Sequence, residues 1–319
     1  MSLSMMGNAE DDPLIDRESG RKKGTGLSKN KGAGGGHTTQ GMAPASKEVV
    51  EKTTFGTHEE ALIWLNITDC IGIIFASLVW IATLYAFSCW IVFYMSGQIS
   101  VVSFLPAILL IFMALWSHLA TMMGDPGAVP WNAHPIERDR KSGAKLHVCG
   151  HCDSYKPPLA HHDRVSGRCI SRMDHFCPWM NNAIGAGNQK NFILFLIYTD
   201  LASLYMYTIV AIHLVDDDIA FTGTGLVLAR VLIFLLLFAI LFTSSMIANQ
   251  CYGIVTGLGT IDRMKMRVDD ETVRGFTVPW SHVFGTDWLP WVLPIDPYYP
   301  KPDLVFRYKL KDYGYGRTV

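Results

Sequence analysis

The stretch VLIFLLLFAILFTSSMIANQCYGIVT, residues 231–256, contains no charged side chain. A helix needs about 20 consecutive apolar residues to cross the hydrocarbon core of a bilayer, and this run is long enough. Three further runs have the same character: residues 70–95, 99–123 and 192–215, of which only the last carries an acidic residue, Asp200. We therefore predict an all-α integral membrane protein with four transmembrane helices. Four such runs argue against the alternative, in which they are buried helices of a large soluble core.

The composition of the chain agrees with this prediction. Of its 319 residues, 50% are hydrophobic and 17% are charged, against roughly 25% charged residues in typical soluble domains. The formal net charge of −1 gives no basic footprint for nucleic acid, so we predict no nucleic-acid partner. Seven cysteines are too few for a disulfide scaffold. The lipid bilayer is therefore the first predicted partner of the chain.

Basic residues predict the side of the membrane on which each segment lies. Of the 27 Lys and Arg residues, eight precede the first run, nine lie in the stretch 138–190 and nine follow the fourth run. The short connections near 96–98 and 216–224 contain none. The positive-inside rule therefore places both termini and the middle stretch in the cytosol. Asn66-Ile67-Thr68 fits the glycosylation pattern, but on this cytosolic side we predict that it is unmodified.

These features divide the chain into five segments. The first is a polar tail that cannot bury a core and is predicted to be disordered. The segments are the tail 1–56, an interfacial stretch with the first two spans at 57–123, a cytosolic domain at 124–191, the last two spans at 192–256, and a cytosolic C-terminal tail at 257–319.

Polar and thiol groups within the spans carry their own expectations. Asp200 is costly in lipid, so it should face the bundle interior and bond a hydroxyl such as that of Thr83 or Ser117. Three cysteines lie in or next to the spans and are interpreted as packed thiols; they are Cys70, Cys89 and Cys251.

The middle segment contains a pattern of metal ligands. Cys149 and Cys152 form a C-x2-C unit, His162 follows ten residues later, and Cys169 seven residues after that. Three thiolates and one imidazole suit tetrahedral structural zinc, and a metal would replace the hydrophobic core that this short loop lacks. His151 and His161 are alternative imidazole ligands. A disulfide is disfavoured because the cytosol is reducing.

Residues 173–182, MDHFCPWMNN, place Asp174, His175 and Cys177 within four positions. A thiolate is a good nucleophile when a neighbouring His takes its proton or stabilises its charge, and a carboxylate can orient that His. The alternative is that Cys177 is a further zinc ligand or a packed thiol. Composition alone leaves both interpretations open.

Residues 149–192 resemble the cysteine-rich domain of the DHHC protein S-acyltransferases, the palmitoyltransferases, here with a DHFC variant of the motif. The matching residues are Cys149, Cys152, Lys156-Pro157, His161-His162, Cys169, Arg172-Met173-Asp174-His175, Cys177-Pro178-Trp179, Asn181-Asn182, Ile184-Gly185, Asn188 and Phe192. Asp125-Pro126-Gly127 matches the family's DPG motif, and residues 259–262 stand where the family has TTxE. The resemblance covers about residues 60–290, and DPGAVP with NQKNF is most similar to the Golgi-type branch.

The resemblance implies a reaction. Cys177 would take a long-chain acyl group from palmitoyl-CoA and pass it to a cysteine of a cytosol-facing membrane or peripheral protein. His175 would carry the proton and Asp174 would orient His175. A multi-pass endomembrane protein of the Golgi or the endoplasmic reticulum is expected, with a small zinc-bound cytosolic domain between the second and third helices.

The resemblance also assigns binding residues. Cys149, Cys152, His162 and Cys169 match the first zinc set of the family. Lys156 and His161 match positions that face the phosphates of CoA. Trp179, Phe192 and Phe195 would line a cavity for the acyl chain, with plain helix packing as the equal alternative for the two Phe residues. Thr260 matches the Thr that supports the catalytic Asp.

The chain departs from the family at its second zinc set, which would map onto Asp163, Ser166, Phe176 and Ala183. None of these is a good zinc ligand, so we predict one zinc ion per chain, with Phe176 and Ala183 filling the vacated site by packing. Leu159 stands where the family often has Arg, and Gly259 and Asp262 replace the outer residues of TTxE. These changes bear on CoA affinity more than on reaction type.

Two other functions are compatible with parts of the sequence. The first is a zinc-bound membrane scaffold of the same fold that binds acyl-CoA or partners with little or no turnover. The second is a transporter or channel, which would need several charges inside the membrane. Only Asp200 and Arg230 are candidates for that role.

Overall fold

The computed structural model describes residues 64–131, 133–141, 146–215, 221, 223–269 and 278–309. The predicted tail 1–56, the start of the interfacial stretch, the loop 216–220 and the end of the chain from residue 310 lie outside these residues. Four helices are long and apolar enough to cross a membrane, which confirms the predicted fold class. Their bounds are α2 Cys70–Met95, α3 Val101–Met122, α5 Gln189–Val215 and α6 Gly223–Thr256.

The helix bounds extend beyond the apolar runs where polar residues can continue or cap a helix. Helix α5 begins three residues before its apolar run, and α6 begins at Gly223 and includes Arg230. Helix α2 begins after Asp69, whose carboxylate accepts the amide of Ile71 at 3.1 Å. A carboxylate in this place satisfies one of the free N–H groups of the first turn.

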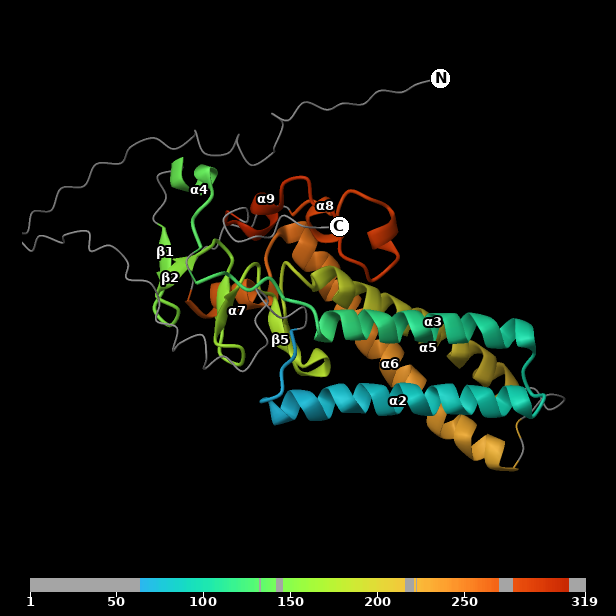
Figure 1. The fold of residues 1–319 in the computed structure, drawn as a ribbon. Coiled ribbons are helices and arrows are strands. Elements are labelled where there is room, and N and C mark those ends of the chain that lie inside the picture. Colours follow the sequence, from blue (N-terminus) through green and yellow to red (C-terminus); the bar gives the residue numbers. More distant parts are fainter. Residues whose placement is uncertain are drawn as a thin grey trace, which may run out of the picture. The chain divides into compact units, whose positions relative to one another are not determined.

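The long helices pack through α2–α3, α3–α5, α5–α6 and α2–α6 contacts (Figure 1). Their common core contains large buried side chains, among them Trp90, Phe93, Met206 and Leu232. Apolar side chains also point outward, for example Val102 and Phe234, which are 77% and 69% exposed. Exposed apolar surface over whole helices is what a lipid-facing protein requires.

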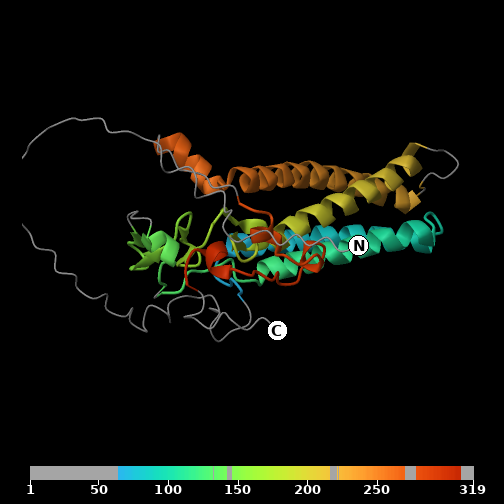
Figure 2. The ribbon, with the colours of Figure 1, turned by 90° about the horizontal axis from the view of Figure 1, so that it is seen from above.

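The segment between α3 and α5 contains six short strands in three antiparallel hairpins. This segment lies at one end of the long helices (Figure 2). The strands are β1 His147–Cys149, β2 Ser154–Lys156, β3 His161–Asp163, β4 Arg168–Ile170, β5 His175–Cys177 and β6 Asn182–Ile184. Strands of three residues bury too little surface to be stable alone. These hairpins therefore depend on their metal-ligand cluster and on packing against the helices, since η1 (Pro178–Met180) contacts both α2 and α3.

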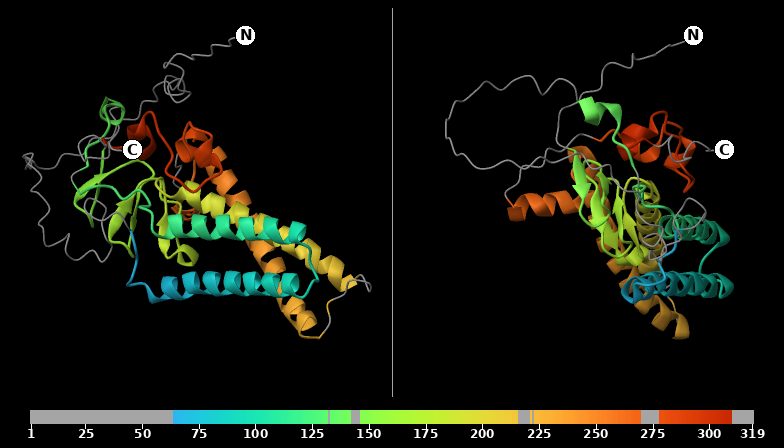
Figure 3. Two further views of the ribbon diagram at one scale, coloured as in Figure 1. Left: turned by 45° about the vertical axis from the view of Figure 1, so that its right-hand side comes forward. Right: turned by 60° about the vertical axis from the view of Figure 1, so that its left-hand side comes forward.

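Short helices complete the described chain. They are α4 Glu137–Lys141, α7 Thr260–Asp269, α8 Ser281–Phe284, η2 Leu289–Trp291 and α9 Pro302–Phe306. Figure 3 shows α8 and α9 at the same end of the long helices as the strands. The Lys190 ammonium at the start of α5 donates to the carbonyls of Leu293, at 3.0 Å, and Ile295. The Ser171 hydroxyl donates to the Phe306 carbonyl at 2.6 Å, so the C-terminal segment is fixed to the site region.

Two expectations about the spans are wrong in detail. The Asp200 carboxylate accepts hydrogen bonds from Thr243 at 2.7 Å and Ser244 at 2.9 Å on α6, not from Thr83 or Ser117. Those two hydroxyls instead bond carbonyls of their own helices, as hydroxyls inside a helix often do. Cys70 is exposed rather than packed, whereas Cys89 is buried and Cys251 half-buried.

The glycosylation pattern at Asn66 is structurally blocked. Asn66 is 2% exposed, and its amide nitrogen donates to Asn181 Oδ1 at 3.0 Å. Because the acceptor nitrogen is already bonded inside the fold, we expect no glycan there. Mass spectrometry of the peptide containing Asn66, from protein made in a eukaryotic host, should find it unmodified. A glycan on this residue would contradict both the fold and the predicted orientation.

Candidate active site and metal centre

Three Cys sulfurs and one His nitrogen meet between the first two hairpins. The ligand atoms of Cys149, Cys152, His162 and Cys169 all lie within 4.8 Å of one another. Cys149 ends β1, Cys152 lies in the turn that follows, and His162 pairs with Cys169 across β3 and β4. The hairpins therefore bring together the four residues that the spacing predicted.

The donor set fits zinc chemically. His162 Nδ1 is 3.2 Å from Cys152 Sγ and 3.7 Å from Cys149 Sγ, and the three cysteines are buried. The hydrogen bond between Cys152 and Cys169 lowers the pKa of the Cys152 thiol, which favours a thiolate. Buried thiolates with one imidazole are the donors of structural zinc sites. His151 stacks on His162 at 4.6 Å instead of joining the set.

The place of the second zinc set is filled by other interactions. The Asp163 carboxylate accepts the backbone amides of Val165 at 3.3 Å and Ser166 at 2.9 Å. Phe176 pairs with Ala183 across β5 and β6, and both pack in an apolar cluster with Ile170 and Met173. A capped turn and apolar packing thus occur at the four positions onto which the resemblance maps a second zinc set, and the contact of Phe176 with Ala183 is the packing that the sequence predicted.

This arrangement predicts one zinc ion per chain. Elemental analysis of purified protein should give a zinc-to-protein ratio of about one, because each structural zinc needs four donors. Phe176→His should leave the ratio unchanged, since a single imidazole gains no cysteine partners here. A ratio of two in either protein would overturn the prediction.

The side chains of strand β5 point alternately to two faces, one with His175 and Cys177 and the other with Phe176. Successive side chains of a strand point to opposite faces, so His175 and Cys177 share one face and Phe176 lies on the other. The His175 Nδ1 atom is 2.7 Å from Asp174 Oδ2, and Cys177 is buried. Phe176 packs in the apolar cluster with Ile170, Met173 and Ala183. This chain has Phe176 where the DHHC motif has its second His. Because that position lies on the opposite face, the difference leaves Asp174, His175 and Cys177 in place.

The Asp174 carboxylate receives donors from two segments distant in sequence. Oδ1 accepts the Thr260 amide at 2.7 Å, and Oδ2 accepts the Gln250 side-chain amide at 2.9 Å and the Thr260 hydroxyl at 3.3 Å. Burial opposes ionisation, but the bond and charge of His175, with these donors, lower the pKa of the carboxyl to about 2. Gly259 permits this approach, because a Cβ there would lie 3.2 Å from Asp174 Oδ1.

His175 lies between the Asp174 carboxylate and the Cys177 thiol. Burial favours the neutral ring, but the hydrogen bond that His175 donates to Asp174 and the interaction with Cys177 outweigh it and raise the pKa of His175 to about 9. An imidazolium beside a thiol stabilises the thiolate. The site therefore places a proton donor, His175, beside the Cys177 sulfur.

Cys177 lies against an apolar cluster formed by three of the long helices and the turn η1. Phe192 and Phe195 of α5 are 2% and 7% exposed in this cluster, and Trp179 packs on Phe75 with ring centroids 4.7 Å apart. The other members include Met180, Ile184, Leu196, Val79, Met246 and Ile247. The Trp179 carbonyl is 3.0 Å from His118 Nε2 of α3. All three residues predicted to line an acyl cavity thus meet beside Cys177.

The residues predicted to face CoA lie further from the thiol. His161 is 9% exposed, and its Nε2 is 2.7 Å from Asp262 Oδ1 while its Nδ1 is 3.2 Å from Lys265 Nζ. An ammonium only donates, so Nδ1 accepts and Nε2 donates to Asp262. Lys156 is half-buried in β2. His161 therefore joins β3 to α7, and the Lys265 ammonium is the cation beside it.

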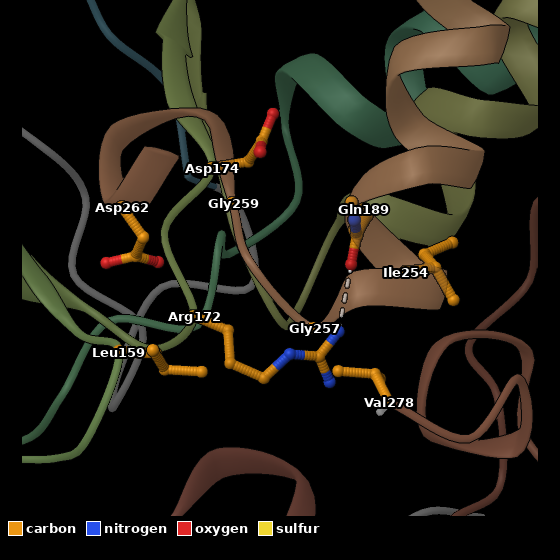
Figure 4. A pocket seen from close by; sticks show the side chains of 10 residues that line it. Leu159, Arg172, Asp174, Gln189, Ile254, Gly257, Gly259, Asp262 and Val278 are labelled. Carbon is orange, nitrogen blue, oxygen red and sulfur yellow. Dashed lines mark hydrogen bonds between the residues drawn. The ribbon is translucent and has the colours of Figure 1, made fainter. Parts of the chain in front are cut away.

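A pocket opens next to Asp174 (Figure 4). Leu159, Arg172, Gln189 and Asp262 line it with backbone from Gly257 and Gly259. Sequence reasoning did not find Arg172, Gln189 and Gln250 as parts of the site. Arg172 and Gln189 stand in the matched runs Arg172-Met173-Asp174-His175 and NQKNF, which gave them no role, and Gln250 stands outside every matched run.

The comparisons with known proteins agree with this site. The family model DHHC palmitoyltransferase matches residues 143–267. The chain is 37% identical to Palmitoyltransferase ZDHHC3 of Homo sapiens over 248 residues, covering 69% of this chain and 83% of that protein. It is 35% identical to Palmitoyltransferase ZDHHC3-A of Danio rerio, over 65% of this chain and 71% of the relative. It is 32% identical to Palmitoyltransferase ZDHHC7 of Rattus norvegicus, over 64% of this chain and 71% of that relative. With four membrane helices, a Cys/His cluster and an Asp–His–Cys face, the chain belongs to the DHHC palmitoyltransferases and is a protein S-acyltransferase.

Proposed function

We propose that Cys177 is the residue that carries the acyl group from a long-chain acyl-CoA, palmitoyl-CoA foremost, to cysteines of partner proteins. The observation that supports this most directly is the shared face of β5, where His175 lies between Asp174 and the buried Cys177 thiol. Among the described cysteines that are not in the metal-ligand set, no other has both a His side chain with a raised pKa beside it and an apolar cluster around it.

In the first step the Cys177 thiolate attacks the carbonyl carbon of the acyl-CoA thioester. A new S–C bond forms, the bond to the CoA sulfur breaks, and the leaving thiolate takes a proton from His175. Asp174 keeps His175 oriented and charged, in the way a carboxylate fixes a catalytic imidazole. One thioester replaces another, so no further energy source is needed.

In the second step a cysteine of the partner protein loses its proton to His175 and attacks the acyl-Cys177 thioester. The Cys177 thiolate is then the leaving group, and the site returns to its starting state. Zinc bound by the Cys149, Cys152, His162 and Cys169 set would supply structural stability to the hairpins that carry β5.

The acyl chain is proposed to lie among the long helices, in the cluster of Trp179, Phe192 and Phe195. Each buried CH₂ contributes about 0.8 kcal/mol, so a long chain gains substantial affinity from such a site. The CoA phosphates are proposed to lie near Lys156 and His161, with Thr260 supporting Asp174. Lys265 adds a cation at this place, which offsets the Leu found at position 159.

The proposed setting is an endomembrane, of the Golgi or the endoplasmic reticulum, with both termini, residues 124–191 and the C-terminal tail in the cytosol. The basic residues support this orientation through the positive-inside rule. The substrates would then be membrane or peripheral proteins with cytosol-facing cysteines, and the acyl donor would enter from the cytosol.

Labelled palmitoyl-CoA tests the proposal on the full chain in detergent or nanodiscs. The wild type should acquire label that hydroxylamine removes, and Cys177→Ser should not. Cys251→Ser is the matched control, because Cys251 is a half-buried thiol of α6 outside the Asp–His–Cys face, and it should label as the wild type does. Label that persists in Cys177→Ser would refute the assignment of the nucleophile, and an unlabelled wild type would favour the scaffold.

A further inference from the structure

A half-buried cation, the Arg172 guanidinium, lies two residues before Asp174 and is joined to it by hydrogen bonds through two amides. The Arg172 guanidinium donates to Gln189 Oε1 at 2.9 Å and to the His282 carbonyl of α8 at 3.3 Å. Burial lowers the pKa of Arg172, but a guanidinium stays protonated at any physiological pH. Figure 4 shows this side chain passing below Asp174, with the bond to Gln189 drawn.

Two amides complete the connection. Gln189 Nε2 donates to Gln250 Oε1 at 3.1 Å, and Gln250 Nε2 donates to Asp174 Oδ2 at 2.9 Å. Gln250 is 2% exposed and Gln189 is 9% exposed. The bonds therefore run from Arg172 through two buried amides to the carboxylate that holds His175, and Arg172 and Gln189 also line the pocket beside Asp174.

The direction of these bonds follows from chemistry. The oxygen and nitrogen of a Gln amide are hard to tell apart by shape, so the network must assign them. A guanidinium only donates and a carboxylate only accepts. Gln189 must therefore present its oxygen to Arg172 and its nitrogen to Gln250, and Gln250 must then present its nitrogen to Asp174. The ends of the network fix both amides in one orientation.

This orientation delivers a donor to Asp174 Oδ2, the same oxygen that bonds His175. Hydrogen bonds to a charged acceptor are stronger than neutral ones, and a row of polarised bonds ending at a cation strengthens them further. The ionised carboxylate is therefore favoured, and its rotation away from His175 is opposed. The same row joins the start of α5, the end of α6 and the C-terminal segment at α8.

We propose that Arg172, Gln189 and Gln250 are positioning residues for acyl transfer, which hold the Asp174 carboxylate ionised and turned toward His175. The proposal rests on the roles assigned to Asp174 and His175 above. The three residues act through Asp174, since their hydrogen bonds lead to its carboxylate. Arg172 also bonds the carbonyl of His282 in α8. Full activity should therefore depend on the C-terminal segment being packed at this place.

The test measures the rate of label transfer from palmitoyl-CoA to Cys177 over a range of palmitoyl-CoA concentrations. Gln250→Leu and Gln189→Leu should lower the maximal rate about 10- to 100-fold, the size expected for losing a bond to a charged group. The half-saturating concentration of palmitoyl-CoA should stay unchanged. Gln98→Leu is the matched control, since Gln98 is a half-buried amide at the other end of the long helices, and its rate should equal that of the wild type.

A double-mutant cycle with Asp174→Asn separates positioning from general stability. If Gln250 acts through Asp174, Gln250→Leu should change the rate less than about 2-fold in a chain that already carries Asp174→Asn. Zinc content and the thermal transition are measured for every variant. Arg172→Lys keeps the positive charge but loses the planar arrangement of N–H donors of the guanidinium, and it should retain more activity than Arg172→Met. Multiplicative effects in the cycle, a raised half-saturating concentration, or loss of activity only together with zinc and the thermal transition would each overturn the proposal. A wild-type rate that itself fails to depend on Cys177 would instead refute the proposed nucleophile.

Discussion

Replacing Asp174 with Asn should slow transfer of palmitate to Cys177 by roughly 10²- to 10⁴-fold, the range that a positioned acid–base group contributes. The carboxylate is ionised across the working range because its pKa is about 2. Its negative charge helps to raise the pKa of His175 to about 9. An Asn side chain keeps the shape but removes the charge, so the buried imidazolium loses its counter-ion.

The sign of the accompanying pH effect is fixed by this charge. Asp174→Asn removes the charge and the charge-assisted hydrogen bond that oppose the effect of burial, so the pKa of His175 should fall. The step in the pH–rate profile that reports deprotonation of His175 should therefore move to lower pH in Asp174→Asn. Rates of label transfer from mildly acidic to alkaline pH measure both effects. A profile that keeps its wild-type midpoint, or moves to higher pH, would show that Asp174 does not control His175.

Replacing Cys169 with Ser should abolish both zinc binding and activity. A hydroxyl is a poor ligand for zinc, and the free energy of binding structural zinc, about 10–16 kcal/mol in small zinc domains, is largely free energy of folding. Cys169 pairs with His162 across β3 and β4, and the Cys169 carbonyl accepts the Val129 amide at 2.8 Å. Loss of this ligand should disorganise the first two hairpins and, with them, the neighbouring hairpin of β5 and β6.

Three measurements check this expectation in one preparation. Elemental analysis should find no stoichiometric zinc, limited proteolysis should cut within residues 146–185, and labelled palmitoyl-CoA should give no hydroxylamine-sensitive label. Cys70→Ser is the matched control, because Cys70 is an exposed thiol at the start of α2. Retention of zinc and of protease resistance in Cys169→Ser would exclude Cys169 from the metal centre.

The four spans and the metal-ligand set follow from local pattern. An apolar run that spans a bilayer must pair its own backbone N–H and C=O groups, which a helix does. Hydropathy therefore predicts the four helices α2, α3, α5 and α6. The pairing of Cys149 with Cys152 follows from a spacing that fits one tight turn. Strand alternation likewise separates Phe176 from the face of His175 and Cys177. In each case the residues that matter are close in the chain.

The surroundings of Asp174 depend on contacts between distant parts of the chain. Gln250 is 76 residues from Asp174, and Thr260 is 86 residues away. Neither a single Gln in an apolar helix nor the order of two Gln residues indicates a partner. The Asp200 interaction shows the same limit: its charge predicted a hydroxyl partner inside the bundle, but only the packing of α5 on α6 selected Thr243 and Ser244.

The sequence by itself thus determined the membrane fold, the family and the two chemical clusters, because length, hydropathy and ligand spacing act over short stretches of chain. Only the tertiary structure decided which amides support the Asp174 carboxylate and which groups surround His161. The physical reason is that a hydrogen bond requires two atoms to meet within about 3 Å. Packing of whole helices and hairpins, rather than any local pattern, determines where distant side chains meet.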